Sequence, residues 1–170
     1  MKPQFKILLF CLIASCMISC DQVTKNIAKK HLIFASPVSY FHDLFRLEYA
    51  ENTGAALSLG DNLPRTLNFL LLGILPLMMM IAILWYIFNN LKAINIFRLT
   101  ALTLVFAGGI GNLIDRLFRD RHVIDFMNMG IGGLRTGIFN VADLCITTGV
   151  VMLAFSYSRT QRLPMQAKVE

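Results

Sequence analysis

Three aspartates in the second half of the chain lie close to apolar runs, where a carboxylate is unusual. Asp115 occurs in the sequence NLIDR, Asp125 in VIDF and Asp143 in FNVAD. An ionisable group in or near a membrane-embedded segment is costly, and is therefore a candidate for function. These three residues define the region in which we look for chemistry.

Two such carboxylates, brought close together in a partly dry site, cannot both ionise cheaply and would share a proton. One could then act as a base on a water molecule and the other as an acid on a carbonyl, which is the chemistry of an aspartic peptidase. That chemistry requires no metal and no cofactor. The spacing does not decide which two of Asp115, Asp125 and Asp143 form the pair.

The elements that must position these residues are apolar. The chain has 170 residues, 56% hydrophobic and only 15% charged, which is more apolar than a soluble domain of this length. Helices satisfy their own backbone hydrogen bonds, so they are the default for crossing lipid, and a crossing takes about 20 residues. We therefore predict an all-α membrane protein with one domain over residues 1–170. Its four transmembrane helices are expected at about 5–25, 67–90, 97–115 and 139–158.

Between the first two helices the pattern changes. Residues 45–49 alternate as a strand does, NTG at 52–54 is a turn signal, and residues 55–59 can return as a second strand. We expect this small β-sheet on the outer membrane surface. Asp125 is assigned to the loop after helix three, and Pro76 predicts a kink in helix two.

The net charge and the cysteines limit the partners, the metal sites and the membrane orientation that we expect. The formal charge of +6 fits the tendency of basic residues to remain in the cytoplasm, and we expect no nucleic-acid partner. All four cysteines lie in apolar runs, which indicates buried thiols and no metal site. Basic residues are denser in the short segments on the side of the two termini. We therefore place the termini in the cytoplasm and the aspartates at the outer face.

Four helices bring the end of helix one, the end of helix three and the start of helix four to one side of the membrane. Asp21 and Lys25 are one helical turn apart and could pair; the alternative is a lysine reaching the interface beside a solvated aspartate. Asn140 and Asp143 have the spacing of a helix cap, and capping alone is the alternative for that pair.

Five motifs, in this order, resemble lipoprotein signal peptidase, the bacterial type II signal peptidase. They are DQVTK at 21–25, NTGAA at 52–56, GGIGNLIDR at 108–116, VIDF at 123–126 and FNVAD at 139–143. The resemblance implies that Asp125 and Asp143 are the catalytic pair. It implies supporting or substrate-binding roles for Asp21, Lys25, Asn52, Gly54, Asn112, Asp115, Arg116, Asn140 and Ala142.

The resemblance also implies a substrate and a location. The expected substrates are prolipoproteins with a diacylglyceryl group on a cysteine, cut just before that cysteine in the bacterial inner (cytoplasmic) membrane. We expect a multi-pass monomer in contact with membrane lipids. The first alternative is a small proton-coupled transporter or channel subunit, for which mid-span charges and inverted repeats are expected. A second is a lipoprotein or structural membrane protein, since IASC at 13–16 looks like a lipoprotein cleavage site.

Overall fold

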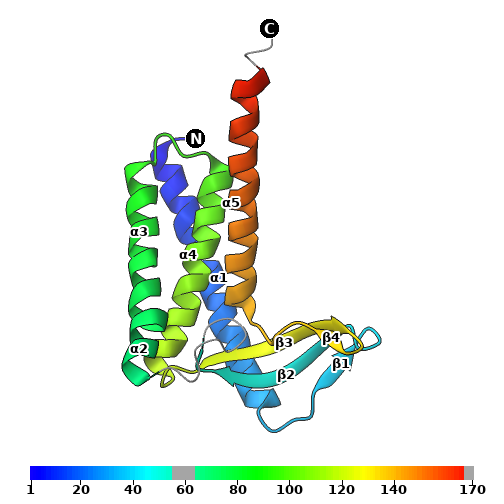
Figure 1. Cartoon of the computed structure of the whole chain (residues 1–170). Helices are drawn as coiled ribbons and strands as arrows, with labels where there is room; N and C mark the ends of the chain where they lie inside the picture. Colours follow the sequence, from blue (N-terminus) through cyan, green and yellow to red (C-terminus); the bar gives the residue numbers. More distant parts are fainter. Residues whose placement is uncertain (55–63, 167–170) are drawn as a thin grey trace.

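The structure, a computed structural model, describes residues 1–54 and 64–166 as a helical bundle with a small sheet at one end (Figure 1). In chain order the elements are α1 (Pro3–Leu32), β1 (Val38–Tyr40), β2 (Phe45–Asn52), α2 (Arg65–Phe69), η2 (Leu70–Ile74), α3 (Leu75–Asn89), α4 (Ile96–Phe118), β3 (Val123–Ile131), β4 (Leu134–Arg135) and α5 (Val141–Gln166). The predicted helical membrane protein with a small sheet is confirmed at this level.

Among the described residues, three helical stretches are long and apolar enough to cross a membrane: Pro3–Leu32, Thr66–Asn89 and Ile96–Phe118. They correspond to the first three predicted spans. The apolar part of α5, Val141–Ser156, is shorter, so the fourth span stays a prediction. Large apolar side chains on the outside of α3, such as Met78 and Trp85, are exposed, as expected of a surface that faces lipid.

Helix α4 lies at the centre of the bundle and packs against α1, α3 and α5. Its contact with α5 is close because glycine leaves room for the neighbouring backbone. A Cβ atom added to Gly108 would lie 2.3 Å from the backbone oxygen of Ala142 at the start of α5. This close approach brings the end of α4 against the first turn of α5, where two of the predicted motifs lie.

A π-helical turn precedes Pro76, where a kink was predicted; the kink itself stays a prediction. η2 covers Leu70–Ile74 and ends directly before α3. Proline has no backbone N–H and cannot donate to the carbonyl four residues before it. A turn with wider hydrogen-bond spacing accommodates that missing donor, and the three pieces continue as one apolar helical stretch.

The sheet differs from the prediction in how it is built. Its order is β1-β2-β3-β4, all antiparallel, so half of it comes from the segment between α4 and α5. Asp125 lies on β3 and not in a loop, and that assignment was wrong. The cause is non-local: Phe45 pairs with Met129 across more than 80 residues. The predicted return strand at 55–59 lies outside the described residues.

Candidate active site

A buried ion cluster joins α1 to the end of α4. Lys25 Nζ lies 2.8 Å from Asp21 Oδ2 and 2.9 Å from Asp115 Oδ2, and it donates to Asn112 Oδ1 at 3.0 Å. Lys25 is fully buried and the two aspartates almost so. The predicted pairing of Asp21 with Lys25 is therefore confirmed, and the solvated alternative is wrong.

The same cluster holds the start of α5. Asp21 Oδ1 accepts a hydrogen bond of 2.9 Å from the backbone N–H of Ala142. A backbone donor in the first turn of a helix has no partner within its own helix, so a carboxylate satisfies it well. The small side chain of Ala142 suits this position, because Gly108 and Gly111 of α4 approach it closely.

Gln22 also belongs to this cluster, and we had not predicted it. Its Nε2 atom lies within 3.1 Å of Asp21 Oδ2, of the Gly111 carbonyl oxygen and of Asp115 Oδ1. Arg119, one turn after Asp115, lies 3.5 Å from the same carboxylate. The sequence could have indicated Arg119 through its spacing of four residues from Asp115. For Gln22 the only indication was its position beside Asp21.

Asp143 is held by the residues around the start of α5. Its backbone N–H donates to Asn140 Oδ1 at 3.0 Å, and its own Oδ2 accepts from the Asn140 backbone N–H at 3.0 Å. This reciprocal pair is a capping box. Asn112 Nδ2 donates to the other oxygen, Oδ1, at 2.9 Å. Capping is thus present, but the carboxylate also lines a cavity, which capping alone does not require.

Asp125 reaches the same place from β3. Asn140 Nδ2 donates to its Oδ1 at 2.6 Å, and Asn52 Nδ2 donates to its Oδ2 at 3.2 Å. Burial, and then the nearby Asp143 carboxylate, raise the pKa of Asp125 to about 6, although the two amide hydrogen bonds act in the opposite direction. Asn140 therefore bridges the two aspartates, and Asp125 is harder to ionise than an ordinary aspartate.

Arg116 does not pair with its neighbour Asp115. Its Nη2 donates to the backbone oxygen of Gly54 at 3.0 Å, and the Gly54 N–H donates to Asn52 Oδ1 at 2.9 Å. Asp115 and Arg116 therefore bond to different groups, because adjacent helical residues point in different directions. Among the described residues, Arg116 Nε is a buried donor without a partner, and its side chain lines the cavity that holds Asp125 and Asp143.

That cavity has a volume of about 670 Å³ and joins the polar groups to an apolar wall. Its polar end contains Asn52, Asn112, Arg116, Asp125 and Asp143. Its apolar part is formed by side chains of three helices, including Pro76, Met79, Met80, Val105, Leu144 and Ile146. Within the described residues no group of three His, Cys, Asp or Glu side chains could hold a metal ion.

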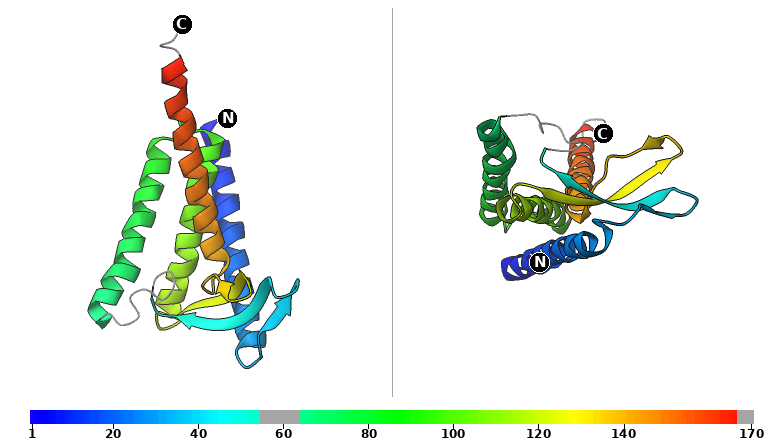
Figure 2. Two further views of the ribbon diagram at one scale, coloured as in Figure 1. Left: turned by 45° about the vertical axis from the view of Figure 1, so that its right-hand side comes forward. Right: turned by 90° about the horizontal axis from the view of Figure 1, so that it is seen from below.

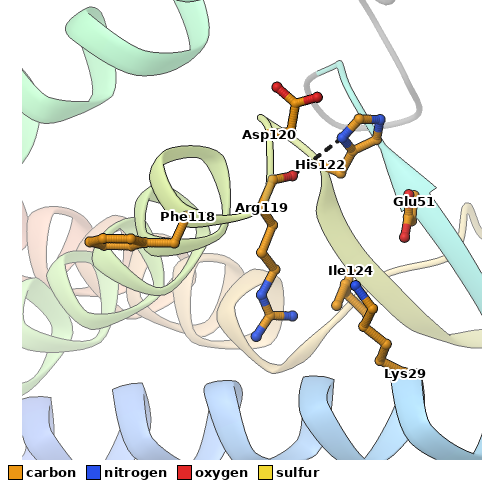
Figure 3. A pocket seen from close by; sticks show the side chains of 7 residues that line it. All are labelled: Lys29, Glu51, Phe118, Arg119, Asp120, His122 and Ile124. Atoms are coloured by element: carbon orange, nitrogen blue, oxygen red, sulfur yellow. Dashed lines mark hydrogen bonds between the residues drawn. The ribbon is translucent and has the colours of Figure 1, made fainter.

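A second cavity of about 360 Å³ lies on the other side of β3 (Figure 3). Ile124 lines it, whereas the adjacent Asp125 lines the larger cavity, because side chains alternate along a strand. Lys29, Glu51, Phe118, Arg119, Asp120 and His122 complete its lining. It contains none of the predicted site residues.

The structure thus brings the eleven predicted residues into two connected groups. Asp21, Lys25, Asn112, Asp115 and Ala142 form the buried cluster. Asn52, Arg116, Asp125 and Asp143 line the cavity, and Gly54 and Asn140 bond to them. Asn112 joins the groups, since its oxygen accepts from Lys25 and Asn140 and its nitrogen donates to Asp143.

Comparison with known proteins assigns the family. The protein-family model described as signal peptidase (SPase) II matches residues 13–159. The chain belongs to the signal peptidase II family. The lipoprotein signal peptidase of Borreliella burgdorferi is 34% identical over 156 residues, covering 89% of this chain and 88% of the relative. That of Borreliella afzelii is 38% identical over 157 residues, with the same shares covered.

Solved structures agree with the family. A bacterial membrane enzyme determined by the in meso method has a TM-score of 0.78 and 30% identity, covering 91% of this chain and 90% of that one. This signal peptidase II protein is therefore a membrane-type peptidase, and signal-peptide removal from prolipoproteins is its activity. The family decides against the transporter and the lipoprotein alternatives. Phe10 and Ala14 of α1 also lie in the core of the bundle.

Proposed function

We propose that the protein is an aspartic endopeptidase that cuts diacylglyceryl-modified prolipoproteins just before the lipidated cysteine. The observation that carries the proposal is the bridge through Asn140, which ties Asp125 and Asp143 together at one end of a cavity whose walls are largely apolar. A signal peptide is a largely apolar helix, so a cavity between helices suits it. Asp21, Lys25 and Asp115 support this site through Asn112 and the start of α5.

Asp125 is the acid and Asp143 the base in this mechanism. Asp125 carries the proton because its pKa is raised to about 6. Asp143 takes a proton from water while the water oxygen attacks the carbonyl carbon before the cysteine, and Asp125 gives its proton to the carbonyl oxygen. As the tetrahedral intermediate breaks down, the C–N bond breaks, Asp143 returns a proton to the leaving amine, and the hydroxyl proton returns to Asp125.

The substrate backbone passes between the aspartates and the sheet. The Arg116 side chain lines the cavity, and its Nε is a buried donor without a partner among the described residues, so we assign Arg116 to a substrate carbonyl. The signal helix occupies the apolar part of the cavity between α3 and α5. In this part of the cavity Gly109 lies close to Met80. Because glycine has no side chain, Gly109 takes up no further space at the cavity wall.

The proposed setting is the bacterial inner membrane, crossed four times. The termini are cytoplasmic, so the aspartates and the sheet lie at the outer face. This orientation follows from the density of basic residues near the termini. The protein acts as a monomer among lipids, without metal or cofactor and without nucleic acid.

A gel-shift assay with a lipidated precursor tests the aspartic mechanism. Asp125→Asn and Asp143→Asn should each abolish conversion while accumulating normally in the membrane. The matched control is Asp120→Asn, an exposed aspartate in the turn after α4 with φ of 48°, a conformation that asparagine tolerates. Full activity of both variants would refute the mechanism. An inactive Asp115→Asn beside an active Asp125→Asn would refute only the choice of pair.

A further inference from the structure

The outer half of the sheet has one apolar face, identified by its register. Tyr40 pairs with Phe45, Phe45 pairs with Met129, and Ile131 pairs with Leu134. Directly paired residues lie on the same face, and so do residues two apart on one strand, such as Met129 and Ile131. We call these five residues the apolar sheet face.

The opposite side of the same strands is polar. Ser39 pairs with Arg46, Arg46 pairs with Asn128, and Arg135 lies beside Gly130. These side chains bond to one another or to the β1–β2 turn: Arg46 Nε donates to Asp43 at 2.6 Å and Arg135 Nε donates to Asn128. The outer half of the sheet is therefore amphipathic, with its polar residues hydrogen-bonded to one another or to the turn on one side.

The apolar sheet face is left open. Leu134 is 84% exposed, Ile131 78%, and Met129 and Tyr40 more than 40%. An exposed apolar group of this kind on one side of an amphipathic sheet indicates a surface that binds something apolar. Exposing these apolar side chains to water would be energetically unfavourable.

The direction of this face points to its partner. Asp125 and Met129, both on this side of β3, line the cavity together with side chains of α3, α4 and α5. The apolar sheet face is therefore turned toward the side where the helices lie. Two views show the sheet extending sideways from the bundle, past α5, at the end where α5 begins (Figures 1 and 2). Beyond α5, that side of the sheet faces the space beside the helices, which lipid fills when the helices cross a bilayer.

We propose that the apolar sheet face rests in the adjacent leaflet of the membrane, with Ile131 and Leu134 among the acyl chains. The face continues the lipid-facing surface of the helices, which is the reason for choosing lipid as the occupant. Its polar side remains toward water. The membrane then holds β3, and with it Asp125, at a fixed height above the apolar cavity. The proposal requires that the helices cross the bilayer, but not that Asp125 is catalytic.

Tryptophan fluorescence tests this placement, because the chain has one tryptophan, Trp85. In a Trp85→Phe background, Leu134→Trp places a reporter on the apolar face, and Ser39→Trp places the matched reporter on the polar face. Each protein is reconstituted without substrate in phosphatidylcholine vesicles, with or without brominated acyl chains. Trp85→Phe alone gives the background signal.

Emission from the Leu134→Trp reporter should be shifted to the blue, quenched by brominated lipid and protected from aqueous iodide. Emission from the Ser39→Trp reporter should behave in the opposite way. If Leu134→Trp does not accumulate, Ile131→Trp, its cross-strand partner, replaces it. Iodide quenching at the apolar face equal to that at the polar face would overturn the proposal. So would lipid quenching that appears only after precursor is added, because the face would then bind substrate.

Discussion

Replacing Asn140 with alanine should move the pH dependence of cleavage. Asn140 donates the shorter of the two amide hydrogen bonds to Asp125, 2.6 Å against 3.2 Å from Asn52. Both bonds stabilise the ionised carboxylate, and they limit a rise in pKa that burial and Asp143 cause. Removing the shorter bond takes away part of the effect that lowers the pKa, while burial and Asp143 still raise it. The pKa of Asp125 should therefore rise further above about 6.

The size of the shift follows from the strength of the lost bond. A hydrogen bond to a charged group contributes about 1.5–3 kcal/mol, and one pKa unit corresponds to about 1.4 kcal/mol, so the expected rise is about one to two units. Protonated Asp125 is the proposed acid, and cleavage therefore falls as pH rises through its pKa. The alkaline limb of kcat/KM should lie near pH 6 in the wild type, set by the free enzyme's Asp125. In Asn140→Ala it should move upward.

The assay is precursor cleavage measured by gel shift in a series of buffers. The absolute rate of Asn140→Ala should also fall, because the alanine removes the cap of α5, so the position of the limb is the diagnostic quantity. Asn52→Ala should move the limb in the same direction by less. Asn26→Ala is the control, since this amide lies on the exposed side of α1 and bonds to Arg119. An alkaline limb that stays in place or moves to lower pH would refute the reasoning.

Two further predictions concern stability, measured by thermal unfolding in detergent. Lys25→Met leaves buried Asp21 without its cation and Asp115 with only Arg119 at 3.5 Å, and should destabilise the fold by about 3–5 kcal/mol; an unchanged Tm would contradict the buried cluster. Gly108→Ala places a Cβ atom 2.3 Å from the oxygen of Ala142 and should cost about 1–3 kcal/mol. Gly73→Ala, where the nearest atom is 3.5 Å away, should be harmless; equal losses would refute the close-packing argument.

Local patterns predicted much of this architecture. Uncharged runs of sufficient length predicted the helices, because a helix satisfies its own backbone wherever it lies. The Asp21–Lys25 pair and the Asn140–Asp143 cap are separated by one helical turn or less, so their geometry is fixed once the helix forms. The motifs also predicted which end of the bundle carries the polar groups, since three of them, at 21–25, 108–116 and 139–143, lie at the ends of predicted helices.

The sheet was only half predicted. The alternation at 45–49 indicated a strand, and β2 contains it. Asp125 was assigned to a loop because its strand has glycines nearby and gains its partner from a segment more than 70 residues earlier. The choice between Asp115 and the other aspartates also came from resemblance, because spacing alone could not decide it.

The sequence by itself thus determined the helices, their apolar outer surface and the set of residues at one end of the bundle. Only the tertiary structure decided how those residues are divided. Lys25 lies between Asp115 and Asp21 in a closed cluster. Asp125 and Asp143, in contrast, have no cation bonded to them among residues 1–54 and 64–166, and they share Asn140 beside an open cavity. The reason is physical: a pKa and an ion pair depend on which groups from α1, β3, α4 and α5 come within a few ångströms. That proximity arises from the glycine-mediated contact of α4 with α5 and from the pairing of β2 with β3.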